Sequence, residues 1–155
     1  FDKNRDKMEK MRAMGNNVTA LYPHQEDIAR QVRTADLLIG AVLIVGEKAP
    51  HLVSESMVKT MRAGSVIIDI SVDQGGCIAT TRPTSYDEPV FVKYGVTHFG
   101  LTNMPGSVPR TSSQALSASL MPYLLDLAES PEELSAPLLK GVNIDAGEII
   151  HPALK

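Results

Sequence analysis

The chain has 155 residues, of which 43% are hydrophobic and 21% charged, a composition typical of one folded domain and unlike that of a disordered or fibrous protein. Its net charge of −3 argues against a nucleic-acid-binding surface, which would carry a basic stripe and a high isoelectric point. Apolar runs such as Leu37–Val45 fall far short of the ~20 residues that span a bilayer. We therefore expect neither nucleic acid nor a membrane among its partners.

The first half of the chain alternates between helical and extended patterns. Stretches with apolar residues at helical spacing are separated by short β-branched or apolar runs. The run Ala35–Leu43 is almost continuously apolar, as expected of a strand covered on both faces, so we predict a central strand there. In chain order the predicted elements are a helix at 2–14, a strand at 18–22, a helix at 24–32, the strand at 35–43, a helix at 54–61 and a strand at 66–70.

The second half begins with a predicted short strand at 96–101 and a loop rich in Pro and Gly. A longer helix is predicted at 112–128, with a kink at Pro122, which removes one backbone donor. A weaker amphipathic helix is predicted at 132–139. The alternation of strands with helical crossovers predicts a parallel α/β sheet. Because ligands bind at the carboxyl ends of parallel strands, the informative residues should follow Leu21, Val42, Ile70 and Leu101.

Cysteine and histidine give no sign of a metal site. Cys77 is the single cysteine, so the chain forms no internal disulfide, and we predict a reducing, cytoplasmic setting. The four histidines are dispersed without the spacing of metal ligands. We therefore predict no metal, and we interpret Cys77 as a small buried residue and not as a nucleophile.

Three long motifs lie near the predicted strand ends. They are IGAVLIVGEKAPHLVSESMVKTMRAGSVIIDISVDQGGC at 39–77, TRPTSYDEPVF at 81–91 and GLTNMPGSVPRTSSQAL at 100–116. In this order and spacing they resemble the alanine dehydrogenases, over essentially the whole chain. The related transhydrogenase alpha subunits have a Gln-Asn-Gly-Gly-like sequence where this chain has Asp73-Gln74-Gly75-Gly76. That difference favours the dehydrogenase, and a transhydrogenase fragment remains the alternative.

The resemblance implies that Asp73 is the catalytic residue that this chain contributes. In the family the corresponding aspartate lies beside the nicotinamide and takes part in acid–base chemistry. A carboxylate there could accept or relay the proton released as an amine is oxidised and water adds. From the local sequence alone, an Asp before Gln-Gly-Gly is also an ordinary turn former.

The resemblance also implies a set of NAD-binding residues. Asp2 would bind the ribose hydroxyls with Lys7 nearby, although Asp2 could instead be an unremarkable polar residue near a chain end. Asn103 and Met104 would hold the nicotinamide carboxamide, although Asn103 could instead form an Asx turn. The expected cofactor-binding residues are Asp2, Lys7, Val42, Leu43, Ile70, Ser71, Val72, Asp73, Leu101, Thr102, Asn103 and Met104.

The phosphate-binding motif GxGxxG does not occur in the sequence. We therefore expect an incomplete Rossmann-like parallel sheet whose first strand and glycine loop are absent, leaving an unpaired edge beside the central strands. The expected organisation is a partial NAD-binding domain at 1–130, followed at 131–155 by a C-terminal helix and tail that in the family pack back toward the substrate domain. The start at Phe1, without an initiator Met, is interpreted as the edge of a longer protein.

The expected function is part of an oxidoreductase for reversible NAD-dependent oxidative deamination of L-alanine to pyruvate and ammonia. The isolated chain is predicted to be inactive. Besides the transhydrogenase reading, a non-catalytic fragment that associates with its missing half stays open. NAD, L-alanine and pyruvate are the expected ligands of the full-length enzyme. The family implies a homo-oligomer, commonly a hexamer.

Overall fold

The computed structural model of the chain describes residues 1–44, 48–129 and 133–154. Contacts divide the chain into two compact units. The first is made of Phe1–Leu43 and Lys48–Thr102, and the second consists mainly of residues from Asn103 onward. The sequence predicted a boundary at residue 130, after which a helix and tail pack toward the substrate domain in the family. Since that packing concerns longer relatives, the boundary stays a prediction.

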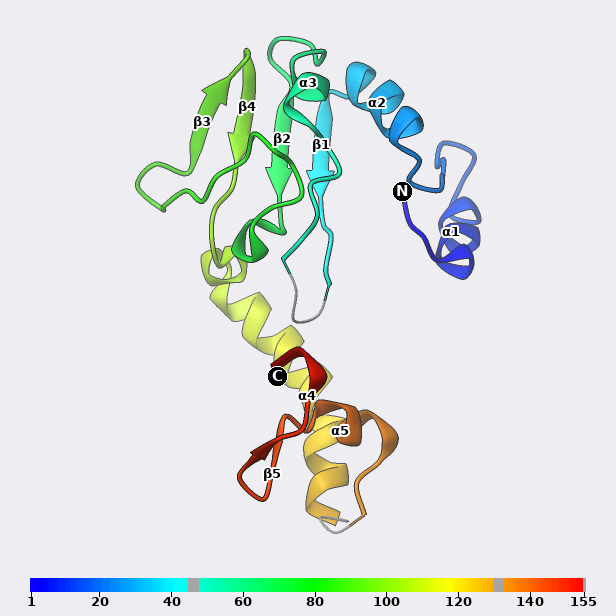
Figure 1. Cartoon of the computed structure of the whole chain (residues 1–155), viewed down its shortest axis with the longest axis vertical. Coiled ribbons are helices and arrows are strands. Elements are labelled where there is room, and N and C mark those ends of the chain that lie inside the picture. The colour runs from blue at the N-terminus through cyan, green and yellow to red at the C-terminus, as the bar shows by residue number, and fades with distance from the viewer. Residues whose placement is uncertain (45–47, 130–132, 155) are drawn as a thin grey trace. The chain divides into compact units, whose positions relative to one another are not determined.

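The first unit is a mixed α/β fold with a mostly parallel, four-stranded sheet (Figure 1). Three strands are parallel and the fourth joins one edge in antiparallel orientation, which the sequence did not predict. In spatial order they are β1 (Leu37–Gly40), β2 (Val66–Asp69), β4 (Val96–Phe99) and β3 (Val90–Lys93). The β3–β4 turn places Tyr94 and Gly95 at positive φ (58° and 73°), as the tight turns of β-hairpins require.

The core of the first unit lies between the sheet and its helices. Successive residues of a strand point to opposite faces of the sheet. Ile67 on β2 and Val96 on β4 point to covered faces and are completely buried. Helix α2 (Gln25–Thr34) adds Ile28 and Val32, which are four residues apart and therefore share one helix face. The sequence pattern thus predicted correctly which residues of α2 face the core.

Two shorter helices begin with side-chain caps. In α1 (Arg5–Arg12) the Asn4 side chain accepts a hydrogen bond from the Lys7 backbone N–H, and Met8 is buried. In α3 (Glu55–Val58) Ser54 caps the Met57 N–H in the same way. Both helices end earlier than predicted: α1 at Arg12 and α3 at Val58.

The structure corrects two sequence predictions at the edge of the sheet. β1 is an edge strand and not a central one, and Leu37 and Ile39 each remain 53% exposed. The continuous apolar pattern is typical of a strand covered on both faces. In the described structure, however, the face of β1 that carries Leu37 and Ile39 remains about half exposed. Residues 18–22 form no strand, because a strand needs a neighbouring ladder. The backbone hydrogen bonds here are local turns, Val18 N–H to Gly15 C=O and His24 N–H to Tyr22 C=O, and a single bond from Asp2 N–H to Leu21 C=O. The predicted unpaired edge is therefore the outer edge of β1.

The second unit is built from helices and a small hairpin. α4 continues through Pro122, and the short helix begins at Ala136, later than predicted; residue 132 lies outside the described residues. The β-hairpin was not predicted. The elements are η2 (Met104–Ser107), α4 (Pro109–Glu129), α5 (Ala136–Gly141), β5 (Ile144–Asp145), β6 (Glu148–Ile149) and η3 (Pro152–Leu154).

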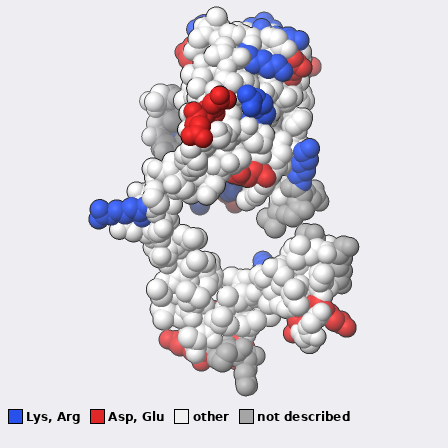
Figure 2. Space-filling view, turned by 90° about the vertical axis from the view of Figure 1, so that its left-hand side faces the viewer, with Lys and Arg blue, Asp and Glu red and all other residues white. Residues whose placement is uncertain are grey.

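The surface of α4 is largely uncharged. Along its 21 residues, Arg110, Asp126 and Glu129 are the charged side chains, and no α4 residue is buried. In the space-filling view the lower part of the chain is mostly white, and most of the Lys and Arg side chains in view lie in the upper part (Figure 2). Within the described ranges, no helix combines the length and the apolar character needed to cross a bilayer.

Candidate functional site

The candidate site lies at the carboxyl ends of the parallel strands. β1, β2 and β4 run in the same direction, so the segments that follow them leave the sheet at one rim (Figure 1). This is the rim where ligands bind in open α/β sheets. The predicted residues Val42 and Leu43 follow β1, Ile70–Asp73 follow β2, and Leu101 follows β4.

A buried carboxylate organises the segment that follows β2. The side chain of Asp69 has no solvent exposure. Its Oδ1 accepts from the Ser71 N–H at 3.0 Å, and its Oδ2 accepts from the N–H groups of Cys77 at 3.0 Å and Ile78 at 3.2 Å. Asp69 therefore joins both ends of the loop 71–78 through one side chain. The sequence analysis did not single out Asp69.

Ser71 links this loop to the segment after β1. Its hydroxyl oxygen accepts a hydrogen bond from the Val42 N–H at 2.7 Å, and the Ile70 N–H donates to the Gly40 carbonyl at 2.8 Å. Two predicted cofactor residues, Val42 and Ser71, are thus in direct contact. The side chains of Leu43 and Ile70 remain 67% and 53% exposed, so they offer apolar surface at the rim.

Asp73 lies in the middle of the same loop. It belongs to the 3₁₀ turn η1 (Val72–Gln74), in which Val72 is buried and Asp73 is exposed. The loop is also tied to the segment between β1 and α3, because the Ala49 N–H donates to the Gln74 carbonyl at 3.0 Å. Asp73 is therefore exposed, at the rim formed by the carboxyl ends of the parallel strands, on a loop whose two ends are fixed.

Lys48 packs across this loop and was missed by sequence reasoning. A Cβ built on Gly75 would lie 2.5 Å from the Lys48 Cε and 2.8 Å from its Cγ. The glycine therefore leaves space for the lysine stem, and it also adopts a left-handed φ of 92°. This contact places a lysine beside the Asp73 loop.

The amino-terminal candidates line a separate hollow. Asp2 and Lys7 both border a cavity of about 360 Å³ beside α1. The Asp2 Oδ1 accepts from the Asn4 N–H at 2.8 Å, so part of this carboxylate serves the local turn. A second hollow of about 350 Å³ runs along β1 and includes Val42, and Phe1 lines both. Asp2, Lys7 and Val42 thus belong to adjoining hollows.

The residues after β4 are divided between the two units. Leu101 is buried and forms an isolated bridge with Thr84, and Thr102 ends the first unit. Asn103 begins the second unit in the left-handed region (φ 49°), and Met104 follows as the start of η2. The parts played by Thr102, Asn103 and Met104 at the site therefore stay predictions.

Cys77 lacks the environment of a nucleophile. It is buried with its Sγ 3.6 Å from the Asp69 Oδ1. Burial, followed by the neighbouring carboxylate charge of Asp69, raises the pKa of the thiol above its ordinary value of 9.0. The thiol therefore remains protonated at neutral pH, which agrees with its interpretation as a small buried residue.

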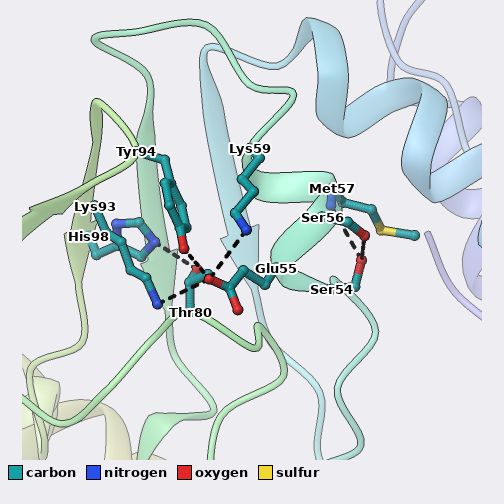
Figure 3. Close-up of polar contacts among 9 residues, drawn as sticks. All are labelled: Ser54, Glu55, Ser56, Met57, Lys59, Thr80, Lys93, Tyr94 and His98. Atoms are coloured by element: carbon teal, nitrogen blue, oxygen red, sulfur yellow. Dashed lines mark hydrogen bonds and ion pairs between the residues drawn. The ribbon is translucent and has the colours of Figure 1, made fainter.

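His98 is buried on β4 and held in one tautomer. Its Nδ1 lies 2.9 Å from the Val96 carbonyl oxygen, which can only accept, so Nδ1 carries the proton. The Nε2 then accepts from the Thr80 hydroxyl at 2.8 Å, as Figure 3 shows. Burial lowers the pKa of His98 below its ordinary 6.5. Its ring stacks on Phe91 and supports the sheet.

A charged cluster beside the amino end of β4 has a structural role. Glu55 of α3 accepts from the Tyr94 hydroxyl and lies 3.5 Å from the Lys93 Nζ and 3.7 Å from the Lys59 Nζ (Figure 3). The Tyr94 hydrogen bond, then Lys93, lowers the pKa of Glu55. The cluster joins α3 to the β3–β4 turn, at the opposite rim from Asp73. Within the described ranges, no three His, Cys, Asp or Glu side chains gather in a metal-binding group.

Comparison with known proteins identifies a family over nearly the whole chain. The family model described as Alanine dehydrogenase/PNT, C-terminal domain, matches residues 1–152. The chain is 46% identical to the alanine dehydrogenase of Lysinibacillus sphaericus and 48% identical to that of Geobacillus stearothermophilus. Each match extends over 145 residues, which is 90% of this chain and 39% of the relative.

Solved structures agree with this result. An L-alanine dehydrogenase superposes with a TM-score of 0.83 at 45% identity, covering 99% of this chain and 44% of that protein. The transhydrogenase from Sinorhizobium meliloti superposes with a TM-score of 0.75 at 25% identity, covering 98% and 41%. The chain thus spans about two-fifths of the length of the curated relatives it matches.

Proposed function

Because this chain belongs to the alanine dehydrogenase/PNT C-terminal domain family, we propose that it forms part of the Rossmann-like, NAD-binding domain of an alanine dehydrogenase. The complete enzyme would interconvert L-alanine with pyruvate and ammonia. The observation that carries the proposal is the position of Asp73, which is exposed on a fixed loop at the ligand-binding rim. The higher identity to alanine dehydrogenases than to the transhydrogenase favours this reaction.

The residues present fit one part of an NAD site. The hollow beside Asp2 and Lys7 suits the ribose on the adenosine side, since a carboxylate there can accept from hydroxyl groups. Leu43 and Ile70 offer apolar surface at the rim, and the hydrogen bond from the Val42 N–H to the Ser71 hydroxyl holds the two segments together there. NAD would supply the hydride acceptor. The glycine-rich motif that binds its pyrophosphate would come from another segment, because the 155 residues contain none.

The proton chemistry would fall to Asp73. Oxidation of an amine to an imine, followed by addition of water, releases protons that a nearby carboxylate can accept. The fixed ends of loop 71–78 would hold Asp73 at a constant place while substrate binds and leaves. Further catalytic groups would come from the other part of the enzyme.

We propose further that the isolated 155-residue chain is inactive and that the working enzyme is a homo-oligomer. Pure chain should give no alanine-dependent NADH absorbance. Mixing it with the amino-terminal part of the Geobacillus stearothermophilus relative should restore turnover. If turnover is restored, the non-catalytic reading fails; if the pure chain is active, the proposed division of the site is wrong.

The role of Asp73 is tested by Asp73→Asn in the reconstituted enzyme. Loss of the carboxylate should lower kcat by about 10²- to 10⁴-fold, the usual contribution of general acid–base catalysis. The affinity for NAD should change little. Asp36→Asn, an exposed aspartate before β1 at the other rim, is the matched control. Equal losses in turnover and cofactor affinity would remove Asp73 from the catalytic role.

A transhydrogenase subunit is the second candidate, because the S. meliloti structure superposes well. It predicts hydride exchange between two nicotinamide nucleotides with no requirement for alanine. Assaying the reconstituted enzyme with and without L-alanine separates the two reactions.

A further inference from the structure

We infer that Asp69 is a positioning residue that sets the place of Asp73 by acting as an internal template for loop 71–78. Its carboxylate accepts from three backbone N–H groups, one at the start of the loop and two at its end. The loop between these points contains Asp73. This inference rests on the proposed function, because Asp73 has a catalytic role only within it.

The burial of Asp69 is costly, which argues for a specific role. A carboxylate removed from water loses its hydration and must be compensated by hydrogen bonds or an opposite charge. Asp69 is not among the ion pairs found in the described part of the chain. Its compensation therefore comes from the backbone donors and the Cys77 thiol. Hydrogen bonds to an ionised acceptor are stronger than neutral ones, so this arrangement fixes the loop tightly.

Two glycines leave room for this arrangement. A Cβ on Gly76 would lie 2.9 Å from the Asp69 Oδ2, and φ at Gly76 is 75°. A Cβ on Gly40, at the end of β1, would lie 2.4 Å from the Cys77 Sγ and 3.4 Å from the Asp69 Oδ1. Gly76 thus leaves room for the carboxylate, and Gly40 leaves room for the Cys77 thiol that donates to it.

The geometry separates two tasks along one short segment. Asp69, the last residue of β2, is buried and points into the loop, whereas Asp73 is exposed. Ser71 lies between them and binds Val42 N–H, so the same segment is held to β1. A change at Asp69 should therefore move Asp73 without removing any group that touches substrate or NAD.

The first test uses the 155-residue chain and does not depend on enzymatic activity. Asp69→Asn keeps the shape of the side chain but replaces one acceptor oxygen by an NH₂ group, which faces backbone donors. Amide hydrogen exchange measured by NMR should become about tenfold faster or more at Cys77 and Ile78, as expected for loss of hydrogen bonds to a charged acceptor. Exchange at Ile67 and Ile68 in β2 should change much less. Unchanged exchange at 71–78 would overturn the inference.

Ser65→Ala provides the matched control. Ser65 is a buried polar residue just before β2, and its hydroxyl donates to the Ala35 carbonyl. It should lower overall stability without selective exchange in loop 71–78. If Asp69→Asn fails to fold, Cys77→Ala replaces it, since that variant removes the thiol contact and keeps the carboxylate with its three backbone donors. Because that variant leaves the template intact, any increase should be small and confined to 77–78. The deciding measurement is then on the wild-type chain, where the amides of Cys77 and Ile78, which donate to Asp69, should be protected from exchange; unprotected amides at both positions would overturn the inference.

The second test is a double-mutant cycle in the reconstituted enzyme. Asp69→Asn alone should lower kcat by about a hundredfold, as expected for a misplaced catalytic group, with little change in NAD affinity. In an Asp73→Asn background it should lower kcat no further, because its effect passes through Asp73. Additive losses would show that Asp69 is merely structural.

The two proposals can fail separately. If the reconstituted wild-type enzyme shows no alanine-dependent turnover, the proposed function fails, and the exchange experiment still decides whether Asp69 fixes the loop. If turnover is present and exchange at 71–78 is unaffected by Asp69→Asn, the positioning role fails and the proposed function stands.

Discussion

The two units of the chain differ in how they bury apolar side chains. All buried apolar residues of the described chain lie between Met8 and Leu101, in the first unit. In the second unit, α4 and α5 have no buried residue. Leucines along α4 are about half exposed; they are Leu116, Leu120, Leu124, Leu125 and Leu127.

This difference separates a unit with its own core from one whose apolar surface is uncovered. Burial of a Leu side chain contributes roughly 1.5–3 kcal/mol, so the first unit gains most of the hydrophobic free energy within this chain. The exposed leucines of α4 contribute little until another surface covers them. That surface would belong to the proposed oligomer or to the remainder of the enzyme.

The largest predicted effect contrasts two isoleucines in strands. Ile67→Ala, at a completely buried position in β2, should lower the free energy of unfolding by about 2–5 kcal/mol. Ile149→Ala in β6, where the side chain is 47% exposed, should change it by about 0.5 kcal/mol or less. Urea denaturation followed by circular dichroism measures both. Equal losses would mean that the second unit has a core of its own.

A smaller contrast compares two glycines at positive φ. Gly76 and Gly147 have φ of 75° and 86°, so an alanine costs about 1–2 kcal/mol of backbone strain at either position. At Gly76 the new methyl group would also meet the Asp69 Oδ2 at 2.9 Å, whereas nothing lies within 4 Å at Gly147. Gly76→Ala should therefore lower the urea midpoint more. If Gly147→Ala proves as costly, the tight packing assigned to the Asp69 loop is wrong.

The smallest predicted effect is a pH dependence from His98. Burial lowers the pKa of His98 from 6.5, so protons bind the unfolded chain in preference to the folded one. Stability from this residue is present above pH 6.5 and is lost as the pH falls toward the lower folded pKa. Between pH 7 and pH 5 the urea midpoint of wild type should fall more than that of His98→Gln. The control is Ile67→Ala, which lowers stability but removes no titratable group and should therefore keep the wild-type pH dependence; a His98→Gln protein that behaves like wild type would contradict the prediction.

The sequence alone determined several local elements and the position of the distinctive loop. Helix α2 follows from Ile28 and Val32 at helical spacing, and β2 follows from a short apolar run. The motif at 70–77 contains Ser71 and Asp73 and directly follows the predicted strand that became β2. Since ligands bind at the carboxyl ends of parallel strands, the sequence indicated this loop as the candidate site. These features depend on residues close together in the chain, and such residues are visible in the sequence.

Tertiary structure decided what depends on pairing between distant segments. The apolar run of β1 is compatible with a central or an edge strand. The sheet order shows that β1 pairs with β2 and with no other described strand, so its outer edge is open. β3 was missed because its four residues gain strand character from pairing with β4. An aspartate at the end of an apolar strand has the same sequence pattern whether it faces water or the interior. Asp69 could be identified as a buried acceptor only once residues 71–78 had folded back onto it, since its hydrogen-bond partners extend nine positions along the chain.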